Sequence, residues 1–238
     1  MQYSSPLIPA RLVRRYKRFL ADMLLEDGTA ITAHCANPGS MLSLAEPGRR
    51  CWLSRNPDPK RKLGFSWEIE ETPAGGVGIN TARANQVVAE ALAQGAIPEL
   101  ARWPVTRREV ADGGGSRLDF QLSGPDGSRC WLEVKSVTLC RRAGLAEWPD
   151  SRSVRGLRHL ESLTALAAGG TAAALLFLIQ RPDCAAFRVA ADIDPAYARA
   201  LTALRTQTET AKPLILAYDC AVSPLGIEFR RRVDIINR

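Results

Sequence analysis

One pattern restricts the folds open to this chain more than any other: Asp119 precedes, across a turn-rich segment, the triplet Glu133-Val134-Lys135. Both flanks are apolar runs typical of short buried strands, and the Gly-, Pro- and Asp-containing segment 123–128 is typical of a hairpin loop. Because side chains alternate along a strand, Glu133 and Lys135 project from one face and Val134 from the other. The pattern therefore predicts a β-hairpin that presents carboxylates beside an ammonium group.

Burying two carboxylates and a lysine among apolar neighbours costs free energy unless a cation or ion pairs compensate. We expect Asp119 and Glu133 to bind Mg²⁺ or Mn²⁺, hard cations that also accept phosphate oxygens. Lys135 would orient a metal-bound water and stabilise charge developing on the phosphate. The alternative is a polar sheet edge with a Glu–Lys surface pair, since charged triplets are common on strands. Taken alone the triplet favours the polar edge, so the choice depends on the flanking sequence.

The flanking segments are similar, in order and almost end to end, to the sugar fermentation stimulation protein A family. The resemblance is carried by PLIPARLVRRYKRFLAD, HCANPGSM, GINTARAN, SRLDF, EVKSVTL, PDSRSVRGLRHL, LFLIQR and IDPAYA. The family usually has Pro and Thr where Ala36 and Pro38 stand, and Phe where Trp148 stands. The D…ExK pattern is also the signature of the restriction-endonuclease-like PD-(D/E)xK superfamily.

The resemblance implies a bacterial DNA-binding protein of mixed α/β class. Residues 1–81 would form an OB-like barrel, and residues 82–238 a restriction-endonuclease-like domain with a central mixed sheet flanked by helices. It also implies two further members of the site. Glu90, on a helix predicted after GINTARAN, would be a second metal ligand, although a solvated position fits it equally well. Gln180, at the end of the apolar run AAALLFLIQ, would touch the metal water or the scissile phosphate.

The N-terminal part also indicates a barrel, because short strand-like runs alternate with turn residues. The pattern fits an OB fold or an SH3-like barrel, and the resemblance selects the OB fold. The runs are 12–25, 29–35, 50–54, 64–71 and 76–80.

Basic and aromatic residues are interleaved on the first of these runs, as a surface that binds nucleic acid without base specificity requires. One face would carry Arg14, Tyr16 and Arg18, the other Arg15, Lys17 and Phe19, with one of the two rings in the core. A second basic run, which a solvated loop would explain equally well, adds to the predicted interface. The predicted barrel contacts are Arg14, Arg15, Tyr16, Lys17, Arg18, Lys60, Arg61 and Lys62.

The segment 140–153 is expected to be a long basic loop over the site, followed by a helix that Ser151 or Ser153 caps. Arg155, Arg158 and His159 have helical i, i+3, i+4 spacing near the start of that helix. They are predicted to contact phosphate, and the alternative is an ordinary solvated face.

Composition favours a polyanionic partner, because the chain has 32 Lys and Arg residues but only 25 Asp and Glu residues, and the arginine guanidinium matches the geometry of phosphate. A genome rich in G and C would also raise the arginine content. DNA is the expected partner, RNA is not excluded, and the oligomeric state stays open, with a homodimer among the options.

The chain is expected to be cytoplasmic and nucleoid-associated, since it shows neither a membrane-spanning run nor a secretory h-region. Its six cysteines and two histidines have no CxxC or paired-histidine spacing, so we expect reduced core cysteines and no structural zinc site. The intact D…ExK residues favour a metal-dependent nuclease. A non-catalytic DNA-binding regulator of sugar-utilisation genes and a metal-binding scaffold for a protein partner are the alternatives.

Overall fold

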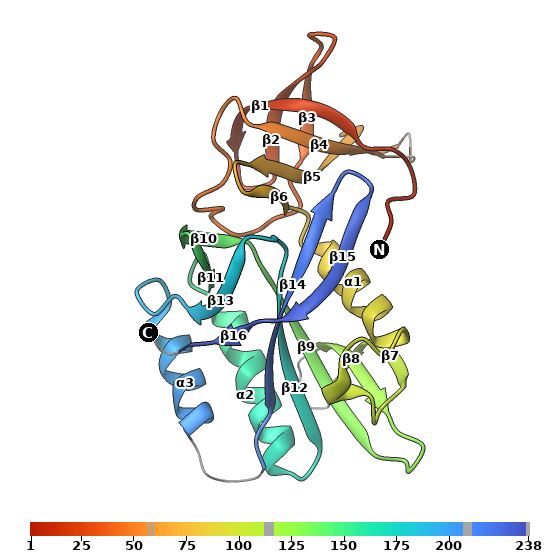
Figure 1. Cartoon of the computed structure of the whole chain (residues 1–238), viewed down its shortest axis with the longest axis vertical. Helices are drawn as coiled ribbons and strands as arrows, with labels where there is room; N and C mark the ends of the chain where they lie inside the picture. The colour runs from red at the N-terminus through yellow and green to blue at the C-terminus, as the bar shows by residue number, and fades with distance from the viewer. Residues whose placement is uncertain (57, 59, 112–116, 207–210, 237–238) are drawn as a thin grey trace.

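In the computed structural model, residues 1–56, 58, 60–111, 117–206 and 211–236 of the chain are described. A β-barrel formed by the N-terminal part stands on a larger α/β unit, and the two are joined end to end (Figure 1). No helix among the described residues is long and apolar enough to span a bilayer.

The barrel is a ring of five strands with a sixth strand attached. Its strands are β1 (Ile8–Tyr16), β2 (Leu20–Leu25), β3 (Ala30–His34), β4 (Arg50–Arg55), β5 (Phe65–Thr72) and β6 (Gly75–Gly78). The order β3-β2-β1-β4-β5-β6 is closed by parallel pairing of β3 with β5, at His34 and Ser66. Closure removes the free sheet edge and encloses a core around Met23, Leu53 and Trp67. The predicted OB-like barrel is confirmed.

The first predicted run is a hairpin and not one strand. Between β1 and β2, Lys17 and Arg18 have φ values of 47° and 62°, so the chain reverses where continuous alternation was expected. Phe19 is therefore 42% exposed and Tyr16 is only half-buried. The prediction that one of these rings lies in the core is wrong, because apolar Ala21 and Met23 of the returning strand fill that space.

The α/β unit contains a six-stranded sheet between helices. The sheet comprises β7 (Val105–Ala111), β8 (Arg117–Ser123), β9 (Arg129–Val137), β12 (Ala172–Ile179), β14 (Leu214–Ser223) and β15 (Gly226–Arg232). The helices are α1 (Ala82–Ala93), η1 (Pro98–Leu100), α2 (Val154–Ala168) and α3 (Pro195–Thr206).

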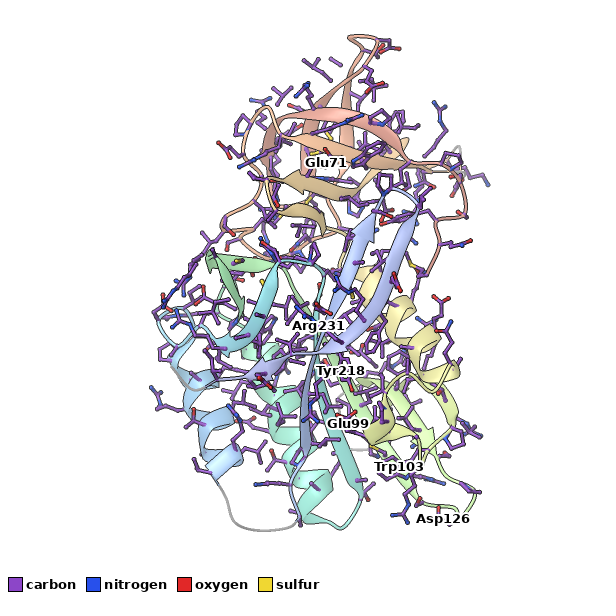
Figure 2. All side chains as sticks on the ribbon, viewed as in Figure 1. Glu71, Glu99, Trp103, Asp126, Tyr218 and Arg231 are labelled. Carbon is purple, nitrogen blue, oxygen red and sulfur yellow. The ribbon has the colours of Figure 1, made fainter. Side chains whose placement is uncertain are left out.

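This sheet is mixed, with strand order β15-β14-β12-β9-β8-β7. β7, β8 and β9 form an antiparallel meander, while β12 runs parallel to both β9 and β14. One apolar layer packs the sheet against α1 and the other packs it against α2 and α3. Tyr218 of β14 donates to Glu99 of η1 at 2.7 Å, a contact at the α1 side of the sheet (Figure 2). The predicted central mixed sheet flanked by helices is confirmed.

The segment predicted as a loop over 140–153 contains two strands, β10 (Leu139–Arg142) and β11 (Gly144–Trp148). With β13 (Cys184–Val189) and β16 (Asp234–Ile235) they form a second, four-stranded sheet. Gly144, at φ 80°, allows the tight reversal between them. The buried Glu147 carboxylate accepts hydrogen bonds from Arg141 and Arg188, which fastens the three strands that carry these residues.

Specific polar contacts fix the barrel on the α/β unit. Arg83 of α1 donates two hydrogen bonds to the buried Glu68 of β5, at 2.7 and 3.0 Å. Gly78 N donates to Gln180 O at 2.9 Å, and a Cβ atom at Gly78 would lie only 3.0 Å from the Gln180 amide oxygen. At the other end, the Met1 amine donates to Ile227 O of β15 at 2.8 Å. The extreme N-terminus thus packs on the α/β unit.

One buried acid in the barrel is only half satisfied. Glu70 of β5 is 1% exposed; Oε2 accepts from Ala45 N at 2.8 Å, while Oε1 is buried without a hydrogen-bond partner among the described residues. Burial raises the pKa of this carboxyl from 4.5 to about 7. Folding consequently takes up a proton at Glu70 between these pH values.

We predict that the effect of Glu70→Gln on the unfolding free energy is more favourable at alkaline pH than at acidic pH. The wild type loses stability as pH rises through the raised pKa, since the native state binds the proton more tightly than the unfolded state does. The difference in unfolding free energy, variant minus wild type, should increase by about 2 to 3 kcal/mol between pH 5 and pH 8. Urea unfolding at these pH values measures it. Glu228→Gln, which changes an exposed carboxylate, is the control. If the pH profile of stability for Glu70→Gln ran parallel to that of the wild type, the prediction would be wrong.

Candidate functional site

The candidate site begins where β8 and β9 separate. Their regular pairing runs from Ser123 and Arg129 to Phe120 and Leu132. Beyond this pair, the side chain of Asp119, and not a backbone carbonyl, accepts the hydrogen bond from β9. Its Oδ2 accepts from Val134 N at 2.8 Å. The carboxylate is thus held by the strand that carries the Glu-Val-Lys triplet.

Helix α1 supplies the second hold on this carboxylate. Asn85 Nδ2 donates to Asp119 Oδ1 at 2.8 Å. Each carboxylate oxygen has two lone pairs, so both oxygens of Asp119 retain capacity for another ligand. Sequence reasoning missed Asn85, although it stands at the end of the GINTARAN motif.

Glu133 is the centre of a buried charged cluster. Its Oε1 accepts from Lys135 Nζ at 2.6 Å and pairs with His159 Nδ1 of α2. Oε2 is buried without a hydrogen-bond partner among the described residues. The Glu133 side chain is only 4% exposed and that of Lys135 11%, so the strand places the predicted pair inside the protein and not on a solvated edge.

The two carboxylates are electrostatically unequal. Burial, together with the negative charge of Glu133, raises the pKa of Asp119 to about 6. Burial alone would also raise the pKa of Glu133, but the hydrogen bond from His159 and the charge of Lys135 outweigh it and hold that pKa below its ordinary value. The cluster therefore keeps Glu133 ionised, and a positive charge between the two acids would favour ionisation of Asp119 as well.

These observations fit a divalent cation held by Asp119 and Glu133. Glu133 Oε2 is a buried acceptor with no partner among the described residues, and a group of this kind is costly unless something binds it. The Asp119 oxygens retain free lone pairs. Oxygen donors of this type suit Mg²⁺ and Mn²⁺.

His159 belongs to this cluster, contrary to the prediction of a surface phosphate contact. The ring is 5% exposed because His159 lies on the apolar stripe of α2 with Gly156 and Leu163. Its Nε2 accepts from Arg155 Nε at 3.3 Å, which assigns the proton to Nδ1, facing Glu133. The helical spacing of that stripe was the available sequence signal.

The rest of the predicted helix face is solvent-accessible. Ser153 caps α2, with its side chain accepting from Gly156 N at 3.0 Å, so one of the two predicted caps is confirmed. Arg155 and Arg158 are both exposed. The i, i+4 pair Arg155 and His159 thus connects the surface with the buried carboxylate.

Two further residues predicted for the site contact partners outside the Glu133 cluster. The Glu90 carboxylate pairs with the amine of Met1, so α1 presents Asn85 and not Glu90 to Asp119. Gln180 Nε2 donates to Ser136 Oγ at 2.7 Å. Because Ser136 and Lys135 project from opposite faces of β9, this Gln180 contact lies on the face of the sheet opposite to Lys135. The structure therefore does not bring Glu90 to Asp119. The Gln180 Oε1 is buried without a hydrogen-bond partner among the described residues, and its predicted role at the metal water or the scissile phosphate stays a prediction.

The predicted basic residues of the barrel fall into two groups. Arg15 has a structural role, since its guanidinium donates hydrogen bonds to the backbone carbonyls of Arg18, Asn37, Gly39 and Ser40.

The second group is more accessible. Arg14 pairs with Asp22 at 2.9 Å, and Tyr16 donates to the same carboxylate at 3.0 Å. The remaining predicted barrel contacts are exposed, namely Lys17, Arg18, Lys60, Arg61 and Lys62.

A cleft of about 450 Å³ separates the barrel from the α/β unit beside the cluster. Arg18 lines it from the barrel, and Trp148, Arg152 and Arg155 line it from the α/β unit. Lys135 Nζ lies 5.9 Å from the centre of the Trp148 ring. The cleft thus brings exposed arginines of both units to one place beside Trp148, whose ring lies near Lys135.

Two family models match the chain. The model of the SfsA N-terminal OB domain matches residues 13–79, and that of the sugar fermentation stimulation protein RE domain matches residues 82–226.

Relatives match along nearly the whole length. A sugar fermentation stimulation protein homolog of Ruegeria pomeroyi is 52% identical over 229 residues, covering 96% of this chain and 98% of the relative. One of Rhodospirillum centenum is 50% identical over 235 residues, covering 99% of both. The solved structure of SfsA from Pyrococcus furiosus in complex with Ca²⁺ is 27% identical and has a TM-score of 0.88, covering 99% of this chain and 98% of that one.

We predict that Arg15→Ala lowers the unfolding free energy by about 2 kcal/mol, because several backbone carbonyls lose a charged donor. Lys17→Ala, which changes an exposed neighbour in the same turn, should stay within about 0.5 kcal/mol of the wild type. Denaturant unfolding of the two variants makes the comparison. Equal stability of both would show that Arg15 is not a structural residue.

Proposed function

The chain belongs to the sugar fermentation stimulation protein family, and from this premise we propose that it is a DNA-binding protein whose α/β unit hydrolyses phosphodiester bonds with a divalent cation. The observation that carries the proposal is the buried Glu133 carboxylate, with one oxygen bound by Lys135 and His159 and the other without a partner among the described residues. Membership alone does not define the chemistry, so the proposal rests on this arrangement.

Asp119 and Glu133 would hold the cation, and Mg²⁺ or Mn²⁺ suits their oxygen donors. The related protein from Pyrococcus furiosus was solved in complex with Ca²⁺, a cation with the same preference for oxygen ligands. When bound, the cation would neutralise charge on a phosphate and lower the pKa of a water ligand.

The protein's own groups would position the reaction. Asn85 and the Val134 amide fix Asp119, so the carboxylate does not have to reorganise when a ligand arrives. The Lys135 ammonium, held against Glu133 at 2.6 Å, would stabilise negative charge that develops on the phosphate. His159 holds a proton toward Glu133 and so keeps that carboxylate ionised and oriented.

The cleft would guide the nucleic acid. Arg18 lines the cleft from one side and Arg152 and Arg155 from the other, and exposed Lys17 continues the positive surface along the β1–β2 turn. Such groups bind phosphates irrespective of base sequence. DNA is the proposed partner, with RNA as a substrate to be tested beside it.

The metal site can be tested by cation binding alone. We predict that Mn²⁺ raises the melting temperature of the wild type and gives a calorimetric binding signal, whereas Asp119→Asn shows neither. Because the pKa of Asp119 is already raised to about 6, the neutral isostere should fold at pH 7. Glu90→Gln is the matched control and should bind Mn²⁺ like the wild type. Full binding by Asp119→Asn would place the cation elsewhere.

The catalytic step can be tested at Lys135. We predict that Lys135→Ala abolishes cleavage of labelled DNA in Mg²⁺ or Mn²⁺ but leaves DNA affinity within a few-fold, since stabilisation of the transition state is lost while phosphate contacts are spread over the cleft. Lys212→Ala, which changes an exposed lysine outside the predicted interface and is purified identically, should retain cleavage.

Two results would reject this assignment. Cleavage by folded Lys135→Ala at the wild-type rate would show that the lysine is not catalytic. Inactivity of the wild type on DNA and RNA across several cations, with DNA binding intact, would identify a non-catalytic DNA-binding protein that retains the nuclease fold.

A further inference from the structure

A second group of possible metal ligands lies outside the carboxylate cluster. Cys140 of β10 meets Asp183 and Cys184 at the start of β13, and one ligand atom of each lies within 4.8 Å of the other two. The small sheet brings them together, because β10 and β13 both pair with β11. Among the described residues this is the one group of three or more such side chains.

We propose that Cys140, Asp183 and Cys184 form a binding site for a thiophilic metal ion of the Zn²⁺ class. Two sulfur donors select soft or borderline cations over Mg²⁺ and Ca²⁺. Zn²⁺ binds thiolates and carboxylates in tetrahedral sites, and three protein ligands leave one position for water or another small ligand. The inference concerns a different cation from the one proposed at Asp119 and Glu133.

The surroundings of the group support a metal site. Arg181 donates to both oxygens of Asp183 at 2.6 and 2.8 Å, and its Nη1 donates to Thr138 O at 2.8 Å. Hydrogen bonds of this kind orient ligating carboxylates in metal proteins. Two thiolates, one carboxylate, one guanidinium and one divalent cation sum to zero charge, so the loaded site would need no further counter-ion.

Cys140 fits the alternative of an ordinary core cysteine less well than the other cysteines do, whereas Cys184 is buried in the apolar layer between the sheet and α2. Cys35, Cys51, Cys130 and Cys220 are buried, in the apolar clusters of the two units. Cys140 is only half-buried and faces a carboxylate and a guanidinium. Spacing along the sequence concealed the pair, since 140 and 184 lie far apart in the chain.

The position of the site indicates what a bound ion would connect. Cys140 N donates to Ser43 Oγ of the barrel at 3.5 Å, and Thr138, whose carbonyl Arg181 binds, directly follows β9. An ion would therefore link β10 to β13 at the junction with the barrel. This is a structural role at the junction, separate from hydrolysis.

The test uses Co²⁺ as a spectroscopic probe for Zn²⁺. The full chain, kept reduced and stripped of metal by chelation, is titrated with Co²⁺ and then with Zn²⁺. We expect thiolate-to-cobalt charge-transfer absorption that one equivalent of Zn²⁺ removes. Cys140→Ser and Cys184→Ser should each lose the absorption and weaken Zn²⁺ binding by at least about 10- to 100-fold, the loss that follows from removing even an outer-shell partner.

Two controls separate this site from other thiols and from the carboxylate cluster. Cys130→Ala removes a cysteine elsewhere, and Glu133→Gln removes a ligand of the proposed hydrolytic site. Both should keep the absorption. In the wild type, Zn²⁺ should also slow alkylation of Cys140, a readout that needs no variant. Absence of charge-transfer absorption in the wild type, or its persistence in folded Cys140→Ser, would overturn the proposal.

Discussion

Much of this structure depends on neutralising one buried negative charge. The Glu133 carboxylate is almost fully enclosed, and a lone ion in such surroundings would be unstable. Its partners come from different elements: Lys135 from its own strand and His159 from α2. Asp119, whose pKa Glu133 helps to raise, is in turn held by α1 through Asn85. Apolar layers pack the helices on the two faces of the sheet, and this electrostatic requirement adds one polar contact from α1 and one from α2 at the site.

Local sequence patterns indicated the barrel, the mixed sheet and the residues at the centre of the site, but the family resemblance was needed to choose the OB fold and to prefer a metal site over a polar sheet edge. Alternating and continuous apolar runs indicated the barrel and the mixed sheet, and the D…ExK spacing identified Asp119, Glu133 and Lys135. A strand fixes the relation of Glu133 to Lys135 by its own geometry. The hairpin loop then leaves few positions for Asp119. The placement of these three residues beside one another was predictable because short-range geometry connects them.

The other members depended on orientation that local patterns do not determine. Glu90 was placed at the edge of a helical stripe, but the rotation of α1 against the sheet turns Asn85 to Asp119 and leaves Glu90 to the N-terminal amine. His159 was read with its charged neighbours Arg155 and Arg158, although it also fits the apolar stripe of α2. In both helices, the face that packs against the sheet determines which side chains reach the site, and tertiary contacts define that face.

Two different sets of possible metal ligands lie on neighbouring strands of this chain: the oxygen donors Asp119 and Glu133, and the group Cys140, Asp183 and Cys184, which contains two sulfur donors. β9 carries the oxygen donor Glu133, and the strand after it, β10, carries the sulfur donor Cys140. Donor hardness, and not distance, separates the cations that each set accepts, because carboxylates favour Mg²⁺ and Mn²⁺ whereas thiolates favour Zn²⁺. The Trp148 ring, which lies near Lys135, lines the cleft at the junction with the barrel, and Cys140 contacts Ser43 of the barrel. If both proposals hold, the junction with the barrel would lie beside both sets of ligands.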